Sequence, residues 1–260
     1  MNSFKQKYGP WALVTGASSG LGAEFAKQLA AERINIVLVA RREDRLRALA
    51  EELKQNSSVE TLVVSADLSQ GDFLGRINEA TTGLEINLLV NNAGSVLSDH
   101  FLSHDIQSEL DILYLNSRAP LILTHHFGKL MKSREKGGII FVASVVGLVG
   151  IPGWSNYAST KGQNLLFAEG LGEELKQDGV DVLALAPAFI RSEFMELTSF
   201  GKFMSLPVDR VVRVALKNLG KKRVVTPGLI HKLIAFSTRL QPRFLNTKIF
   251  RAVISASQGS

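Results

Sequence analysis

The sequence contains no cysteine. Disulfide bonds, thiolate nucleophiles and thiolate metal ligands are therefore excluded, and the chain is compatible with a reducing compartment such as the cytoplasm. Any chemistry must use hydroxyl, carboxylate, amine or imidazole groups, or a bound cofactor. The 260 residues, of which 45% are apolar and 21% charged, suffice for a domain with a substantial core, and they exclude a disordered or fibrous protein.

The chain also lacks a long, uninterrupted apolar helix pattern. The apolar stretch that begins at Trp11 stops at Thr15, so we expect no secretory signal. Residues 137–160 carry no charge, but their five glycines and Pro152 favour a buried strand followed by a loop over a membrane span. We expect a cytoplasmic protein that touches membranes peripherally at most.

Acidic residues are scarce in the C-terminal part. Residues 202–260 hold twelve Lys or Arg against Asp209 alone, a net charge of +11, whereas residues 1–201 carry −5. The overall charge of +6 therefore arises in the C-terminal part. No base-reading or base-stacking motif accompanies this charge, so we expect no nucleic-acid partner.

Short, β-rich apolar runs alternate with helical patterns along the chain. Their near-continuous apolarity is typical of strands that are covered on both faces. The runs span residues 11–15, 34–40, 61–66, 86–90, 139–143 and 180–186. This repeat predicts an α/β fold in which residues 1–260 form a single Rossmann domain, with a doubly wound parallel sheet of about seven strands and helices on both faces.

Unusual polar, Gly and Pro residues follow these runs directly. They are Gly16, Arg41, Asp67, Asn91, Ser144 and Pro187. Because the carboxyl ends of parallel strands meet at one edge of a sheet, and ligands bind beyond that edge, the pattern predicts one shared site there.

The segment TGASSGLG, residues 15–22, joins the first strand to a helix. Gly16 permits a sharp turn, Gly20 lets the backbone approach a pyrophosphate, and the helix N-terminus offers free N–H groups. The Gly-x3-Gly-x-Gly spacing of Gly16, Gly20 and Gly22 is a variant of the dinucleotide-binding fingerprint. A plain tight turn is the alternative interpretation.

The second strand ends in VARRE. An NAD site usually has an acid here that binds the ribose 2′-hydroxyl, but this chain has Ala40. Arg41 and Arg42 offer guanidinium groups suited to a 2′-phosphate, which predicts NADP(H) as the cofactor. The alternative, that both arginines are solvated residues at the start of a helix, applies more to Arg42 than to Arg41.

Two further strand ends complete the predicted cofactor site. Asp67 and Leu68 are expected to flank the adenine, with the carboxylate accepting from the amino group. The NNAG segment, residues 91–94, is expected to bring its backbone close to the ligand, although an Asn-Gly turn would have the same letters.

Catalytic candidates lie in YASTK, residues 157–161, and at Ser144. Tyr157 and Lys161 are four residues apart and share one helix face. A tyrosine has a pKa of about 10, so we expect the Lys161 charge to favour its phenolate near neutrality. A surface helix could carry the same pair, but Ser144 and the Gly-rich loop favour a catalytic role. His125 and His126 are adjacent, point to different faces of a helix and are read as structural, so no metal is expected.

Taken together, TGASSGLG, NNAG, Asn116, Ser144 and YASTK resemble the classical short-chain dehydrogenases/reductases, from residue 10 to about 226. The resemblance implies that Tyr157 is the acid/base, Ser144 orients the substrate oxygen, Lys161 also holds the nicotinamide ribose and Asn116 supports a proton relay. It assigns cofactor binding to Thr15, Gly16, Gly20, Gly22, Asp67, Asn91 and Gly94. The expected cofactor site also includes Ser18, Ser19, Leu21, Leu68, Ala93, Tyr157, Lys161, Pro187 and Ile190. Pro187-Ala188 replaces the family's Pro-Gly, which makes the nicotinamide contacts there less secure.

The expected activity is hydride transfer between NADP(H) and a carbonyl or alcohol substrate, without a metal. A catalytically silent dinucleotide sensor or scaffold is the main alternative, and intact Asn116, Ser144, Tyr157 and Lys161 speak against it. A sugar-nucleotide epimerase is disfavoured, since the chain has little room for a second domain. Apolar residues between Arg191 and Leu206 suggest an apolar or acyl substrate, although a packing role explains them nearly as well. These residues are Phe194, Met195, Leu197, Phe200, Phe203, Met204 and Leu206.

Residues 228–260 form a basic, amphipathic extension in which two helical segments flank Pro242. It resembles the tails of reductases grouped with long-chain oxoacyl and hydroxysteroid enzymes. Three roles compete. We expect an arm that packs in a homo-dimer or homo-tetramer first, an interfacial membrane helix second, and a dock for an acyl carrier protein third.

Overall fold

The computed structural model describes residues 4–191 and 198–258. Its centre is a parallel sheet of seven strands in the order β3-β2-β1-β4-β5-β6-β9. The strands are β1 (Trp11–Thr15), β2 (Asn35–Ala40), β3 (Thr61–Ser65), β4 (Ile86–Asn91), β5 (Gly137–Val142), β6 (Val180–Leu185) and β9 (Val224–Val225). The chain winds outward from β1 in both directions, so the strand order reverses between β1 and β4. A doubly wound sheet opens its ligand crevice at such a point.

The predicted α/β class and doubly wound sheet are confirmed, and all six predicted strands are present within one or two residues. The seventh, β9, was not identified from the sequence. It has two residues, too few to show a pattern, and it exists because it pairs with β6 through Ala184 and Leu185.

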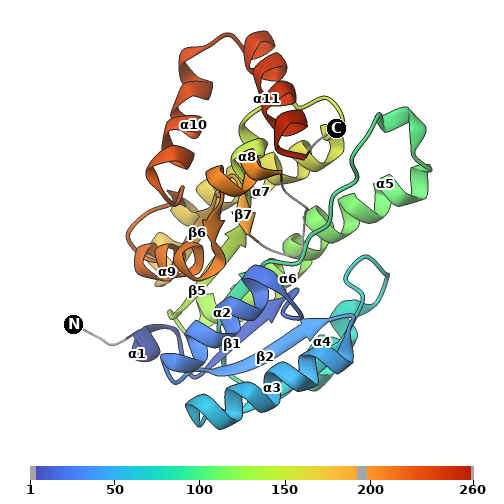
Figure 1. Cartoon of the computed structure of the whole chain (residues 1–260). Helices are drawn as coiled ribbons and strands as arrows, with labels where there is room; N and C mark the ends of the chain where they lie inside the picture. The colour runs from blue at the N-terminus through green and yellow to red at the C-terminus, as the bar shows by residue number, and fades with distance from the viewer. Residues whose placement is uncertain (1–3, 192–197, 259–260) are drawn as a thin grey trace.

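Helices cover both faces of the sheet (Figure 1). One face packs on α2 (Gly20–Ala31), α3 (Glu43–Ser57) and α9 (Val208–Asn218), and the other on α4 (Phe73–Ala80), α6 (Ala119–Ser133) and α7 (Ser155–Glu174). Within β1, Ala12 and Val14 enter the first core while Leu13 enters the second. This sharing explains why the strands read as continuous apolar runs.

Shorter elements complete the body. They are α1 (Phe4–Tyr8), the 3₁₀ turns η1 (Phe101–Ser103), η3 (Val145–Leu148) and η4 (Lys176–Asp178), α5 (Ile106–Leu113), the π-helical turn η2 (Tyr114–Arg118), α8 (Ser199–Met204), and β7 (Ile190–Arg191) paired with β8 (Leu206–Pro207). The uncharged segment 137–160 folds as β5, η3 and the start of α7. Within residues 4–191 and 198–258, no helix has the length and apolarity that crossing a bilayer requires.

The C-terminal extension forms two helices, α10 (Leu229–Leu240) and α11 (Arg243–Gln258), with Pro242 at their junction. Figure 1 shows them as a pair standing at the top of the molecule, away from α1 and α3. Their inner residues Phe250, Ile254 and Ile234 join a third apolar cluster with Trp154 and Tyr157. The extension therefore packs directly on the loop and helix that carry the catalytic candidates.

Candidate active site

A cavity of about 640 Å³ lies at the carboxyl ends of the strands, where the sequence places the site. Most of the predicted site residues line it. They are Gly16, Ser18, Ser19, Gly20, Leu21, Arg41, Arg42, Asp67, Leu68, Ala93, Gly94, Ser144, Tyr157, Lys161, Pro187 and Ile190. The sheet thus brings together residues up to 174 positions apart in the chain.

Four predicted site residues, Thr15, Gly22, Asn91 and Asn116, lie behind the cavity wall. The Thr15 hydroxyl accepts hydrogen bonds from the N–H groups of Asn92 at 2.9 Å and Ala93 at 3.0 Å. Asn91 is buried, and its amide donates to the Thr124 hydroxyl at 3.0 Å. The hydrogen bonds of Thr15 and Asn91 hold the ends of β1 and β4 in position.

The Gly-rich loop has the geometry of an anion cradle. Gly16 and Gly20 have φ angles of +66° and +54°, which side chains rarely permit. A Cβ on Gly22 would lie 2.2 Å from the Gly16 carbonyl oxygen, so only glycine lets α2 pack this closely against the loop. Ser19, the N-cap of α2, makes no side-chain capping bond, which leaves first-turn N–H groups available to a phosphate. The loop therefore fits a dinucleotide.

The two arginines after β2 differ in their contacts. Arg42 donates to the Ser18 hydroxyl at 2.9 Å and to the Ser19 hydroxyl at 2.8 Å, which ties it to the Gly-rich loop. Arg41 has a 71% exposed side chain and lies 3.9 Å from the Asp67 carboxylate. The sequence pattern favoured Arg41 as the phosphate ligand and predicted that Arg42 is the more solvated residue. The structure gives Arg42 the more definite position, because two hydroxyls of the neighbouring loop are within its reach.

Asp67 is less free to bind a ligand than its position suggests. One carboxylate oxygen accepts from the Ser69 N–H at 3.0 Å and from the Ser69 hydroxyl at 2.7 Å. The other oxygen faces Arg41. Its expected contact with an adenine amino group would compete with these partners.

The catalytic candidates converge on the cavity wall between its Gly-rich end and its apolar end. Ser144 follows β5, and its hydroxyl donates to the Pro187 carbonyl at 3.1 Å. Tyr157 and Lys161 lie one turn apart on α7, and the Lys161 Nζ is 5.7 Å from the centre of the Tyr157 ring. The Lys161 ammonium donates to the Val142 carbonyl at 2.8 Å. All three residues are buried and line the cavity, so their polar groups are shielded from bulk water.

Burial dominates the titration of this group. It raises the pKa of the Tyr157 phenol above its usual value and lowers the pKa of Lys161 to about 8. That the Lys161 charge favours the Tyr157 phenolate stays a prediction, because desolvation is the cause of the raised Tyr157 pKa in this structure. Desolvation penalises both charged forms, and a cation 5.7 Å away does not offset it. Burial therefore favours the neutral phenol of Tyr157 over its phenolate.

Asn116 lies in the π-helical turn between α5 and α6. Its side chain accepts from the Ser95 N–H at 2.9 Å and donates to the Thr160 hydroxyl at 3.1 Å, while its backbone carbonyl accepts from Asn164. It is completely buried. Asn116 thus connects the loop after β4 to α7, and the π-turn, a feature frequent at functional sites, aims it there.

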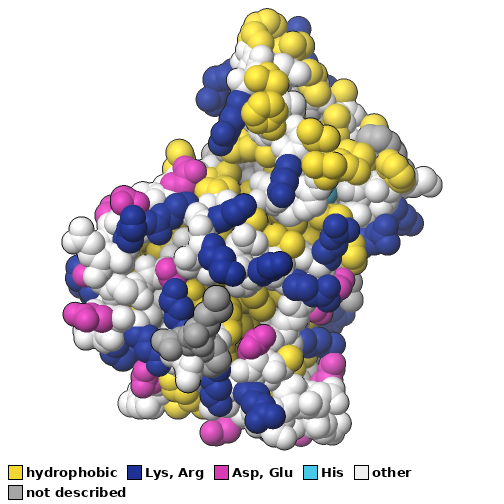
Figure 2. All heavy atoms as spheres, turned by 90° about the vertical axis from the view of Figure 1, so that its left-hand side faces the viewer, with side chains coloured by type: hydrophobic (Ala, Val, Ile, Leu, Met, Phe, Trp, Pro, Cys, Tyr) yellow, Lys and Arg dark blue, Asp and Glu magenta, His cyan; other side chains and the backbone are white. Residues whose placement is uncertain are grey.

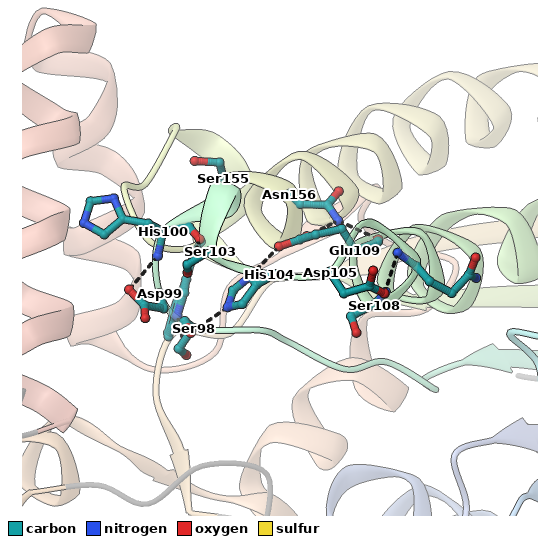
Figure 3. A network of polar contacts seen from close by, with 12 residues as sticks. Ser98, Asp99, His100, Ser103, His104, Asp105, Ser108, Glu109, Ser155 and Asn156 are labelled. Carbon is teal, nitrogen blue, oxygen red and sulfur yellow. Dashed lines mark hydrogen bonds and ion pairs between the residues drawn. The ribbon is translucent and has the colours of Figure 1, made fainter.

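A polar network that the sequence analysis did not single out fixes the start of α7 (Figure 3). The buried carboxylate of Glu109 on α5 accepts from the Asn156 amide at 2.7 Å and contacts the His104 Nδ1 at 2.7 Å. The nearby carboxylate raises the pKa of His104. Asn156 directly precedes Tyr157, so this network anchors the backbone on which the tyrosine stands. No motif marks Glu109, because its role arises from three segments meeting in space.

The outer end of the cavity is apolar and comes largely from the extension. The lining residues there are Val96, Trp154, Met204, Ile234, Ile249, Phe250, Val253 and Ile254. Met204 and Ile249 belong to residues that the sequence predicted as substrate cover or tail. Phe203 and Leu206 do not line it, Phe194, Met195 and Leu197 lie outside the described residues, and the Phe200 side chain is not described.

His231 on α10 connects the C-terminal extension to the rest of the protein by hydrogen bonds. Its ring is buried, its Nδ1 accepts from the Ala188 N–H at 3.3 Å, and its Nε2 lies 3.1 Å from the Met204 carbonyl. These partners require a neutral ring with the proton on Nε2. Burial lowers the pKa of His231, which favours that form. Ala188, which replaces the expected glycine, thus donates its N–H to His231 of the C-terminal extension.

The cavity contains no evident metal centre: in the part of the chain that the structure describes, no three His, Asp or Glu side chains cluster as ligands. His125 and His126 form no such group.

Comparison with known proteins agrees with this arrangement. The family model for short chain dehydrogenases matches residues 10–199. The rat 17-beta-hydroxysteroid dehydrogenase type 3 is 29% identical over 243 residues, covering 92% of this chain and 79% of the relative. The mouse very-long-chain 3-oxoacyl-CoA reductase is 29% identical over 252 residues, covering 94% and 79%.

One solved structure matches nearly the whole chain, and another matches most of it. A 7beta-hydroxysteroid dehydrogenase structure superposes with a TM-score of 0.91 at 25% identity, covering 96% of this chain and all of the other. A short-chain dehydrogenase from Sphingobium yanoikuyae in complex with NADPH is 30% identical, with a TM-score of 0.76 and coverage of 89% and 94%. With the Gly-rich loop, the NNAG turn and the Tyr157–Lys161 pair at one cavity, the chain belongs to the short-chain dehydrogenase family and is a nicotinamide-dependent oxidoreductase.

Proposed function

We propose that this enzyme is an NADP(H)-dependent reductase or dehydrogenase that interconverts a carbonyl and an alcohol on a bulky, apolar substrate. The observation that carries the proposal is the position of Tyr157. It lies at the junction between the Gly-rich end of the cavity, which fits a dinucleotide, and the apolar end built by the tail. A carbonyl placed at this junction would meet the phenol O–H.

In this proposal Tyr157 donates the proton to the substrate oxygen, and burial keeps its phenol protonated at neutral pH. Ser144 orients the same oxygen by turning its hydroxyl from the Pro187 carbonyl to the substrate. Lys161, one turn further along α7, holds the ribose hydroxyls, and Asn116 supports the path by which Tyr157 regains its proton. When bound, the nicotinamide supplies or accepts the hydride.

We infer a preference for NADPH from the end of β2. The absence of an acid at Ala40 removes the repulsion that a 2′-phosphate would meet. Arg42, held against Ser18 and Ser19, and the exposed Arg41 supply two cations at the cavity rim. We propose that the backbone contacts the cofactor at Gly16, Gly20 and Gly94. Thr15, Gly22 and Asn91 support these positions from behind the cavity wall.

Two substrate types are consistent with the apolar end. The relatives include enzymes named for hydroxysteroids and for very-long-chain 3-oxoacyl-CoA. Both present a carbonyl on a large apolar body, which suits walls formed by Trp154, Phe250 and Ile254. Because the tail forms these walls, we also propose that residues 1–260 act as one catalytic unit.

The test is a panel of oxosteroids, 3-oxoacyl-CoA thioesters and small polar ketones, assayed by NADPH consumption. We expect turnover of a bulky apolar member and little turnover of the small polar ones. Phe250→Ala should raise the KM of the accepted substrate at least several-fold with NADPH affinity unchanged, whereas Phe244→Ala, at an exposed position of the same helix, should not. A protein that binds NADPH but reduces no panel member would favour the silent sensor instead.

A further inference from the structure

The pair α10–α11 is apolar on two opposite sides. Its inner side packs against the catalytic loop through Ile234, Phe250 and Ile254. Its outer side exposes large apolar side chains, among them Leu229 at 73% and Leu240 at 70%. Leu233, Phe236 and Phe244 are also more than half exposed. We call these five residues the outer patch. A helix that is apolar all round needs a cover on both sides.

The outer patch lies at a projecting end of the molecule. Figure 2 shows hydrophobic side chains gathered over the upper end, where α10 and α11 stand in Figure 1, with Lys and Arg beside them. In that view, the described part of this end shows no Asp or Glu side chains. Exposed apolar surface of this extent marks a contact site with another molecule or with a membrane.

Charge distinguishes between the possible covers. Lys232, Arg239, Arg243, Lys248 and Arg251 are exposed on the same two helices, and residues 228–260 contain no acid. If the patches of two copies met about a two-fold axis, five cations would face five cations. An anionic lipid surface instead offers phosphates to the cations and an acyl boundary to the leucines and phenylalanines.

We propose that the outer patch docks this enzyme on an anionic lipid surface. The long Lys and Arg side chains reach the headgroups while the apolar side chains enter the interface. The contact is peripheral. If the proposed function holds, an apolar substrate dissolved in the lipid would reach the cavity by way of the same two helices, whose inner side lines it.

The test uses the full chain and sedimentation with two kinds of vesicle, pure phosphatidylcholine and phosphatidylcholine mixed with phosphatidylglycerol. We expect binding at least about tenfold tighter to the anionic vesicles, since each cation near such a surface adds to the affinity. Raising the salt concentration should weaken binding by screening the cations.

Two sets of substitutions separate the contributions. Phe236→Ser with Phe244→Ser removes the apolar anchors, and Arg239→Gln with Arg243→Gln and Lys248→Gln removes the charges. Each set should reduce binding to anionic vesicles about tenfold or more. The matched control, Lys129→Gln with Leu130→Ser, changes an exposed cation and an exposed leucine on α6 and should bind like the unmodified chain.

None of the substituted residues lines the cavity, so NADPH affinity and turnover of a water-soluble substrate should persist in every variant. Absence of sedimentation by the unmodified chain would overturn the proposal. So would retained sedimentation by both variant sets. A shift of the first set to a smaller oligomer in light scattering, without vesicle binding by the unmodified chain, would assign the outer patch to a second copy. None of these results would affect the proposed reaction, which is measured separately.

Discussion

The two ends of the cavity are built in different ways. The Gly-rich end consists of residues that follow directly on strands, and its shape depends on backbone conformation at Gly16 and Gly20. The apolar end consists of side chains from the loops after β4 and before α7 and from η3, α8, α10 and α11, which meet only in the folded chain. Local motifs therefore mark the first end, whereas the second end depends on long-range packing. Tyr157 lies where the two meet.

The largest expected effect is at that junction. Tyr157→Phe removes the proton donor while keeping the ring that packs against Trp154. Turnover should fall by about 100-fold or more, the range of general acid catalysis, with NADPH binding retained. Steady-state assays and a fluorescence titration of NADPH measure the two quantities. Undiminished turnover would remove Tyr157 from the mechanism and leave the two ends without a shared catalytic group.

A backbone change should damage the Gly-rich end selectively. Gly22→Ala places a Cβ against the Gly16 carbonyl, so α2 must shift away from the loop. We expect NADPH affinity to fall by about tenfold or more and the melting temperature to drop, since an overpacked contact typically costs about 1–3 kcal/mol. Gly71→Ala is the control, because nothing lies within 4 Å of its added Cβ. Equal behaviour of the two variants would contradict this view of the loop.

The arginines give a smaller, specific effect. Arg42→Ala should weaken NADPH by several-fold and leave NADH nearly unchanged, because the guanidinium would meet the 2′-phosphate that only NADPH carries. Arg41→Ala should act in the same direction but more weakly, as its side chain is largely exposed and faces Asp67. Equal losses for both cofactors would show that neither arginine reads the 2′-phosphate.

The smallest effect concerns the hydrogen bonds by which His231 connects α10 to Ala188 and Met204. Burial holds the pKa of His231 below its unfolded value of about 6.5, so the folded state resists protonation. Its contribution to stability is complete above that unfolded pKa and is lost as the pH falls from that value through the lower pKa of the folded state, because His231 with both nitrogens protonated cannot accept from Ala188. Melting temperatures between pH 8 and pH 5 should decline more for the unmodified chain than for His231→Gln. Parallel curves would show that His231 does not titrate with unfolding.

Much of the fold was predictable from the sequence, because strands covered on both faces leave continuous apolar runs. Because the carboxyl ends of parallel strands meet at one edge of a sheet, the sequence also predicted that Arg41, Asp67, Ser144 and Pro187 share one site. The relative positions of Arg41 and Arg42 were not predictable, since they depend on which side chain reaches Ser18 and Ser19. The roles of Glu109 and His231 were not predictable for the same reason. Their partners lie on other elements and share no sequence spacing with them.

The sequence by itself determined the α/β class, the Gly-rich cradle and the set of catalytic candidates, because glycine conformations and strand-end positions are local properties. Only the tertiary structure decided that burial raises the pKa of Tyr157, and that the inner side of α10 and α11 lines the cavity while the outer side stays exposed. Both properties depend on what surrounds a residue in space. The sequence alone does not show which apolar side chains of these two helices pack inward. The packing of Phe250 and Ile254 against Trp154 decides it.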